Sequence, residues 1–120
     1  MGLNWLSIGA ISGFLAVGAG AFGAHSLKDI ATPEQLEWWG TAAEYHLMHS
    51  LALLAFGLFR STRESVTQTA GYAYLFGMLV FSGTLYAMAL GAPKWFGAIT
   101  PIGGVALMVG WIAFARAARR

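Results

Sequence analysis

The stretch "TAAEYHLMHSLALLAFGLFR", residues 41–60, decides the fold that this sequence predicts. It is largely apolar, and a run of about 20 apolar residues is long enough to cross the hydrocarbon core of a bilayer as a helix. Its first half nevertheless holds three ionisable side chains, those of Glu44, His46 and His49. The stretch therefore predicts a membrane-spanning helix with a polar feature near its start.

The composition of the whole chain agrees with this interpretation. Of its 120 residues, 58% are hydrophobic and 10% are charged, whereas about 25% of a soluble domain is charged. We predict an all-α integral membrane protein, a four-helix transmembrane bundle that forms a single domain over residues 1–120. The expected helices are approximately 3–24, 33–60, 68–90 and 101–117. A soluble bundle of buried helices is the alternative, and the low charge disfavours it.

Composition also excludes several classes of protein. The chain has no cysteine, so it has no disulfide, no thiolate metal site and no thiol nucleophile. Its formal net charge of +2 is too small to suggest binding to nucleic acid. A signal peptide could end after the small residues 19–21, but no Lys or Arg precedes the apolar run, as such a peptide requires. We therefore expect the first apolar segment to be a helix of the mature protein.

The basic residues lie unequally on the two sides of the four predicted spans. One side holds Lys28 and Lys94, and the other holds Arg60, Arg63, Arg116, Arg119 and Arg120. The positive-inside rule then predicts a multi-pass protein of the bacterial inner (plasma) membrane with both termini in the cytoplasm.

Tryptophan is enriched at membrane interfaces. We therefore expect Trp5 and Trp111 to lie at the cytoplasmic surface.

Two helix starts can be recognised on the outer side. In "ATPEQLEWW", Thr32 is a natural N-cap, Pro33 suits the first helical position, and Gln35 completes a capping box. In "AITPIGG", Thr100 and Pro101 repeat the pattern, so we expect the same kind of cap there.

Small residues form a stripe on the first and on the fourth predicted helix, since they recur at alternating spacings of three and four. Lipid supplies no hydrophobic reason for helices to associate, so close approach of backbones along small residues must supply much of the attraction. We expect both stripes to face other helices. Their members are Gly9, Gly13, Ala16, Gly20 and Gly23 on the first helix, and Gly103, Ala106, Gly110 and Ala113 on the fourth.

The second helix should carry a polar face toward the interior of the bundle. At 100° per residue, Tyr45, His46 and His49 share one sector, while Glu44 projects in another direction. An ionised residue at the centre of a span costs roughly 2.5–3.5 kcal/mol, and one Leu returns only about 0.3–0.6 kcal/mol. We therefore expect the acid and both imidazoles to point toward other helices, with the histidines neutral because burial disfavours their charged form.

Other polar residues should join this cluster. We expect the histidines to bond Ser82, Thr84 or Tyr86, and His25 to lie close to Glu44 or Tyr45. The expected polar intramembrane cluster comprises His25, Glu44, Tyr45, His46, His49, Ser82, Thr84 and Tyr86. The leucines that should meet lipid instead are Leu47, Leu51, Leu54 and Leu58.

Several functions are compatible with such a cluster. The first is a structural or interaction role in the membrane without enzymatic activity, because no catalytic constellation, phosphate-binding loop or cofactor motif is visible. The second is a proton or small-solute pathway, since intramembrane ionisable residues often mark one. A lesser alternative is a metal or haem site formed by His46, His49 and His25. The lipid bilayer is the expected partner, and homo-oligomers are possible.

Five stretches resemble a known family. They are "GAFGAH" (20–25), "TAAEYHLMHSLALL" (41–54), "FSGTLYAMAL" (81–90), "TPIGG" (100–104) and "GW" (110–111). Together they resemble the small bacterial inner-membrane family of unknown function typified by YgdD and YwdK, which is similar to the eukaryotic transmembrane protein 256. The resemblance implies four transmembrane helices and an integral membrane location. It implies no activity.

Overall fold

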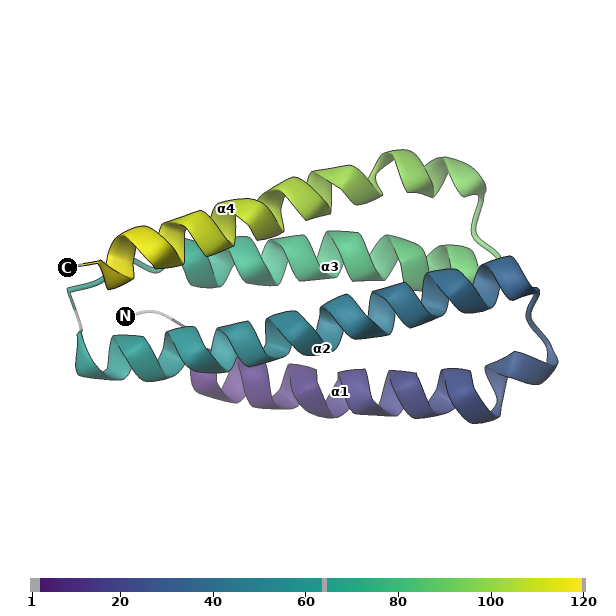
Figure 1. Cartoon of the computed structure of the whole chain (residues 1–120), viewed down its shortest axis with the longest axis horizontal. Helices are drawn as coiled ribbons and strands as arrows, with labels where there is room; N and C mark the ends of the chain where they lie inside the picture. The colour runs from purple at the N-terminus through teal and green to yellow at the C-terminus, as the bar shows by residue number, and fades with distance from the viewer. Residues whose placement is uncertain (1–2, 64, 120) are drawn as a thin grey trace.

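The computed structural model describes residues 3–63 and 65–119. Within these ranges the chain is helical and contains no strand, which confirms the predicted fold class. Four long helices lie roughly along the longest axis of the molecule (Figure 1). They are α1 (Trp5–His25), α2 (Pro33–Thr62), α3 (Thr69–Ala89) and α4 (Thr100–Ala118). The short 3₁₀ helices η1 (Leu27–Asp29) and η2 (Lys94–Ala98) lie in the two connections at one end.

The helix ends lie within two residues of the predicted ones. The largest differences are at the start of α1, expected at residue 3 and observed at Trp5, and at the end of α2, expected at residue 60 and observed at Thr62. Arg120, which entered the charge argument, lies outside the described residues.

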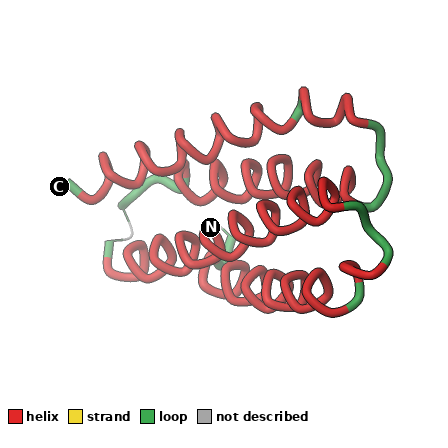
Figure 2. The backbone as a smooth tube through the Cα atoms, turned by 45° about the vertical axis from the view of Figure 1, so that its right-hand side comes forward, coloured by secondary structure: helices red, strands yellow, loops and turns green. Residues whose placement is uncertain are grey.

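Successive helices run antiparallel, and α2 and α3 occupy the middle of the molecule (Figures 1 and 2). The closest packing joins α1 to α2, α2 to α3, and α3 to α4. Among the described residues, α1, α3 and α4 are long and apolar enough to cross a membrane. Because α1 and α3 run in the same direction, the chain must return across the membrane between them. The more polar helix α2 therefore spans it as well, and both termini lie at one end (Figure 1).

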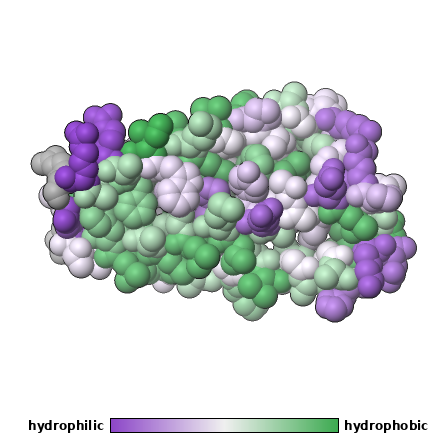
Figure 3. All heavy atoms as spheres, viewed as in Figure 1, coloured by the Kyte–Doolittle hydropathy of each residue, from purple (hydrophilic) through white to green (hydrophobic). Residues whose placement is uncertain are grey.

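Large apolar side chains cover most of the outside of the bundle between two hydrophilic ends, and Figure 3 shows only a few hydrophilic atoms between these ends on one face. Phe14 is 77% exposed, Leu79 65% and Met108 64%. In water such a surface would be unfavourable, whereas a bilayer covers it with acyl chains.

Three of the four leucines that were expected to face lipid on α2 lie on this outer surface. Leu47, Leu51 and Leu58 are exposed. Leu54 is half-buried, because its side chain packs against Gly9 of α1. A Cβ added to Gly9 would lie 3.1 Å from Leu54 Cγ.

The largest group of buried apolar residues lies toward the end that holds the termini. It includes Trp5, Leu53, Phe56, Tyr74 and Leu107. Trp5 is 2% exposed, and its indole N–H donates to Gln68 Oε1 at 3.0 Å. Trp5 thus packs inside the bundle as the first residue of α1, at the end that holds the termini.

The glycines of α1 admit α2 to close contact. A Cβ on Gly9 would lie 3.0 Å from the Leu54 nitrogen, and one on Gly23 would lie 2.5 Å from the Trp39 ring. Ala16 is buried, and Gly13 is half-buried near Ser50.

Gly20 lies differently from the rest of the stripe. It is exposed, with nothing within 4 Å of its Cβ position. It faces α2 across a small cavity that it lines with Trp39 and Gly40, so it does not bring the two backbones into contact.

The glycines of α4 pack against α3 in the same way. A Cβ on Gly103 would lie 2.9 Å from the Gly77 carbonyl oxygen, and one on Gly110 would lie 2.7 Å from the Tyr74 ring. Two alanines of this stripe, Ala106 and Ala113, are half-buried.

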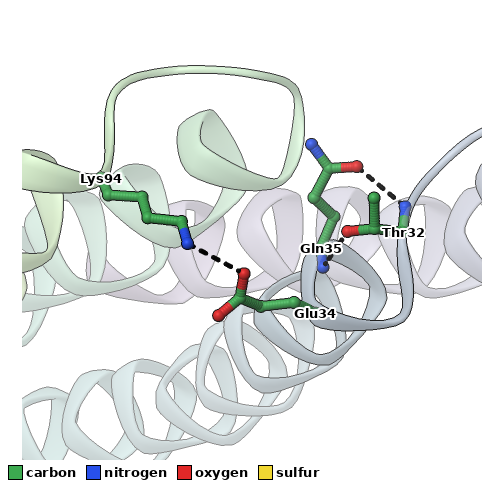
Figure 4. A network of polar contacts seen from close by, with 4 residues as sticks. All are labelled: Thr32, Glu34, Gln35 and Lys94. Carbon is green, nitrogen blue, oxygen red and sulfur yellow. Dashed lines mark hydrogen bonds and ion pairs between the residues drawn. The ribbon is translucent and has the colours of Figure 1, made fainter.

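The two proline-containing helix starts differ. Thr32 and Gln35 form a capping box at the start of α2, with hydrogen bonds of 3.1 and 2.9 Å (Figure 4). Nearby, Lys94 Nζ lies 3.3 Å from Glu34 Oε1 and ties η2 to this helix start (Figure 4). Helix α4, by contrast, begins at Thr100 with Pro101 in its first turn and has no side-chain cap. The cap predicted there is wrong, because the Thr100 hydroxyl bonds elsewhere.

Candidate functional site

The polar face of α2 is directed toward the other helices. His49 and Ser50 are buried, and Tyr45 and His46 are half-buried. The two imidazoles diverge, because His46 contacts α3 and His49 contacts α4. They therefore do not form a pair that could face one ligand.

His49 uses both of its ring nitrogens in hydrogen bonds. Its Nδ1 lies 2.8 Å from the Tyr45 carbonyl oxygen, an acceptor, and the Trp111 indole N–H donates to Nε2 at 3.0 Å. Because a carbonyl can only accept and an indole can only donate, Nδ1 carries the proton and Nε2 is the acceptor. The bonding pattern thus fixes a neutral imidazole in a single tautomer.

His46 joins α2 to α3. Its Nδ1 lies 2.9 Å from the Tyr86 hydroxyl, and the two rings meet edge to face at 5.8 Å. On the same pair of helices, the Ser82 hydroxyl donates to the Ala42 carbonyl oxygen at 2.8 Å.

Thr84 makes no contact with the histidines. It lies 2.6 Å from the Thr100 hydroxyl and links α3 to α4.

A serine pair that was not predicted from the sequence joins α1 to α2. Ser12 Oγ lies 2.6 Å from Ser50 Oγ, and Ser50 donates to the His46 carbonyl oxygen at 2.7 Å. Since Ser50 has one proton, Ser12 donates to Ser50. The available signal was the position of Ser12 on the small-residue stripe, three residues after Gly9.

Two aromatic residues of the site were also missed. Trp111 had been expected at the membrane surface, yet its indole is the donor to His49. Tyr74 is fully buried, with its ring centroid 5.2 Å from that of Trp111 and 5.8 Å from that of His49. Its hydroxyl has no hydrogen-bond partner within the described part of the chain. A tyrosine near the start of an apolar span was the only signal for it.

Glu44 does not belong to the cluster. It is exposed, and it shares the outer face of α2 with Leu47, Met48 and Leu51. Its direction follows from the helical geometry, because position 44 lies 20° from position 51 at 100° per residue. The expectation that this carboxylate points toward another helix of the chain is wrong.

His25 is also separate from the cluster. It is exposed at the end of α1, and no hydrogen bond, ion pair or ring contact joins it to Glu44 or Tyr45 in the described ranges. The contacts of Gly9 with Leu54 and of Gly23 with Trp39 set the register of α1 and α2. This register places His25 beside position 37, about 10 Å along the axis from Glu44 at 1.5 Å per residue.

The arrangement does not favour a metal or haem site. Nε2 of His49 accepts a hydrogen bond and so has no lone pair left for a ligand bond. The described residues contain no group of three or more His, Cys, Asp or Glu side chains arranged to hold a metal ion.

The hydrogen bonds instead make α2 the helix to which all others are tied. Ser50 bonds to α1, His46 bonds to α3, and His49 bonds to α4. Trp39 adds a second link to α1 through its indole N–H, which donates to the Ala19 carbonyl oxygen at 2.7 Å. Interhelical hydrogen bonds of this kind fix which faces of transmembrane helices meet.

Sequence comparisons agree with the predicted family resemblance. A family model described as "Protein of unknown function (DUF423)" matches residues 19–104. The chain is 42% identical over 108 residues to a UPF0382 membrane protein of Staphylococcus epidermidis, covering 90% of this chain and 88% of the relative. It is 40% identical over 112 residues to a UPF0382 membrane protein of Haemophilus influenzae, covering 93% and 90%.

A third relative is the one that the motifs had suggested. The UPF0382 membrane protein YwdK of Bacillus subtilis is 38% identical over 116 residues, covering 95% of this chain and 94% of the relative. No solved structure gives a significant match. With helices that fit a bilayer and relatives named as membrane proteins, the chain belongs to the DUF423 family of membrane proteins of unknown function.

Proposed function

We propose that this membrane protein has a structural or interaction role and that it is not an enzyme. The observation that carries the proposal is the use of the interior polar groups. His46, His49 and Ser50 each bond to a different neighbouring helix. A site that binds or moves a solute needs polar groups that can exchange partners, whereas these groups are engaged in holding the bundle together.

The cavities support the same view. The larger one lies at the end with the termini, and a smaller one lies between α1 and α2 near Trp39. Neither is lined by Tyr45, His46 or His49. The polar cluster is therefore packed against side chains and does not line either of these cavities.

A proton or small-solute pathway is the second candidate, and the exposed Glu44 favours it. A carboxylate on a face that otherwise meets lipid is costly unless it is protonated or paired. In a homo-oligomer, a second copy could cover this face and place the carboxylate between chains.

A flux assay separates the two candidates. Proton entry into liposomes that enclose a pH-sensitive dye is compared for the wild type, Glu44→Gln, His49→Ala and protein-free liposomes. The structural role predicts the same background flux in all four. Wild-type flux above that of protein-free liposomes, reduced to background by Glu44→Gln, would favour the pathway and overturn the structural proposal.

We also propose that the protein lies in the bacterial inner membrane with both termini in the cytoplasm. The support is the charge difference between the two ends: Arg60, Arg63, Arg116 and Arg119 lie near the termini, and Lys28 and Lys94 lie at the other end.

Because the chain has no cysteine, single-cysteine variants report the orientation cleanly. Ser26 and Ser65 are both exposed, and they lie at opposite ends. In intact spheroplasts, a membrane-impermeant maleimide should label Ser26→Cys at once, and it should label Ser65→Cys only after permeabilisation. The reverse pattern would show the opposite topology.

A further inference from the structure

A basic cavity lies at the end of the bundle that holds both termini. Its volume is about 880 Å³, which falls within the range of about 300–1,000 Å³ that is typical of ligand pockets. It lies between the connection from α2 to α3, the first turn of α3 and the last turns of α4. It is lined by Arg63, Ser65, Val66, Thr67, Thr69, Val109, Ile112, Ala113, Arg116, Ala117 and Arg119.

The lining divides into a polar and an apolar part. Arg116 lies in the last turn of α4, and Arg119 follows the helix directly with helical backbone angles, so the two arginines share one face of the helix end. Ser65, Thr67 and Thr69, which carry hydroxyl groups, line the same cavity from the connection between α2 and α3 and the first turn of α3. No acidic side chain lines it within the described part of the chain. These donors and positive charges suit a phosphate group.

The apolar part continues into the surface that meets lipid. Ile112 is 60% exposed and Val109 is 46% exposed, and both also line the cavity. They lie on α4 one to two turns before the arginines, toward the middle of the bundle. A ligand that fills the cavity therefore meets positive charge at the end of the bundle and hydrocarbon on the side toward its centre.

Hydrogen bonds hold the connection from α2 to α3 in place. Arg60 Nε donates to the Val66 carbonyl oxygen at 3.0 Å. Gln68 accepts from the buried Trp5, and the Thr67 and Thr69 hydroxyl oxygens lie 3.4 Å apart. These bonds hold residues 66–69, the hydroxyl-bearing part of the wall, in place.

We propose that this cavity binds an anionic phospholipid. Arg116 and Arg119 pair with the phosphate, the hydroxyl groups of Thr67 and Thr69 donate to its oxygens, and an acyl chain lies along Val109 and Ile112. A zwitterionic phospholipid brings a cation into the same basic site and binds less well. Of the conclusions above, this proposal depends only on the membrane location of the protein. It holds whether the protein has a structural role or forms a pathway.

The test is native mass spectrometry of the full chain in detergent, titrated separately with dioleoylphosphatidylglycerol and dioleoylphosphatidylcholine. The variant Arg116→Gln/Arg119→Gln is compared with Lys28→Gln/Lys94→Gln, which removes two charges at the other end of the bundle. We expect phosphatidylglycerol to bind more tightly than phosphatidylcholine. The arginine variant should lose about fivefold in affinity for each charge removed, and the lysine variant should bind as the wild type does.

A third titration adds inorganic phosphate in excess over the bound phosphatidylglycerol. We expect the lipid to stay bound, because phosphate makes no use of the apolar wall. Complete displacement by phosphate would assign the site to a free anion and overturn the proposal. Equal affinity for the two lipids would also overturn it, as would an equal loss of binding in the lysine variant.

Discussion

At the scale of single residues, the pairing of His49 with Trp111 is the contact most specific to this bundle. It joins the buried imidazole acceptor to an indole N–H across α2 and α4. In lipid a lost polar partner cannot be replaced by bulk water, so the bond contributes to stability, although measured values for interhelical hydrogen bonds are modest.

Removing the indole donor should therefore weaken the bundle. We expect Trp111→Phe to lower the free energy of unfolding by about 0.6–1.7 kcal/mol, because a phenyl ring keeps an aromatic side chain at this position while Nε2 of His49 loses its donor. Trp95→Phe is the matched control, since Trp95 is 63% exposed. Denaturant unfolding of the detergent-solubilised protein, followed by circular dichroism, measures both. Equal stability of the two variants would show that the hydrogen bond from Trp111 to His49 does not contribute measurably to the free energy of unfolding.

The direction of a side chain could be predicted from the sequence better than its partner. The geometry of an ideal helix places Tyr45, His46 and His49 on one side of α2, and they lie on one side. The same geometry puts Glu44 beside Leu51. Because a charge in lipid is costly, we had expected its carboxylate to meet a side chain on another helix, but Glu44 is exposed. Trp111 was assigned to the interface from an average preference of tryptophan, and such averages carry no information about which acceptor a single indole meets.

At the scale of helices, small residues decide how closely two axes approach. Helix α4 packs on α3 through Gly103 and Gly110, where a Cβ would meet the backbone of Gly77 and Phe81 or the ring of Tyr74. The stripes could be read from their spacing. The register could not, because it depends on which glycine meets which side chain, and this is why His25 was placed near the wrong part of α2.

A single methyl group tests this packing. We expect Gly103→Ala to destabilise the bundle by about 1–3 kcal/mol, because overpacking forces α3 and α4 apart. Gly20→Ala is the control, since its Cβ position has nothing within 4 Å and the change gains the same helix propensity. Melting temperatures of both variants in detergent give the comparison. A loss of stability in Gly20→Ala as large as that in Gly103→Ala would contradict the packing argument.

At the scale of the whole molecule, large apolar side chains cover much of the outside of the bundle, as the low share of charged residues predicted. The four blocks of apolar residues became four helices whose exposed faces carry Phe14, Leu79 and Met108. The cavity at the end with the termini could not be foreseen in the same way. It depends on how the last turns of α4 lie relative to the connection from α2 to α3, a property of the assembled bundle rather than of any segment.

A charge placed on the exposed apolar surface should have opposite effects in a bilayer and in water. Phe14 lies near the middle of α1 and is 77% exposed. In a bilayer, Phe14→Lys places a charge among acyl chains at a cost of about 3 kcal/mol, so the fraction of protein that remains in membranes after alkaline extraction should fall. Phe14→Leu should leave it unchanged. In a water-soluble particle the lysine would improve solubility instead, so unaltered membrane retention of Phe14→Lys would mean that this face of α1 does not meet lipid.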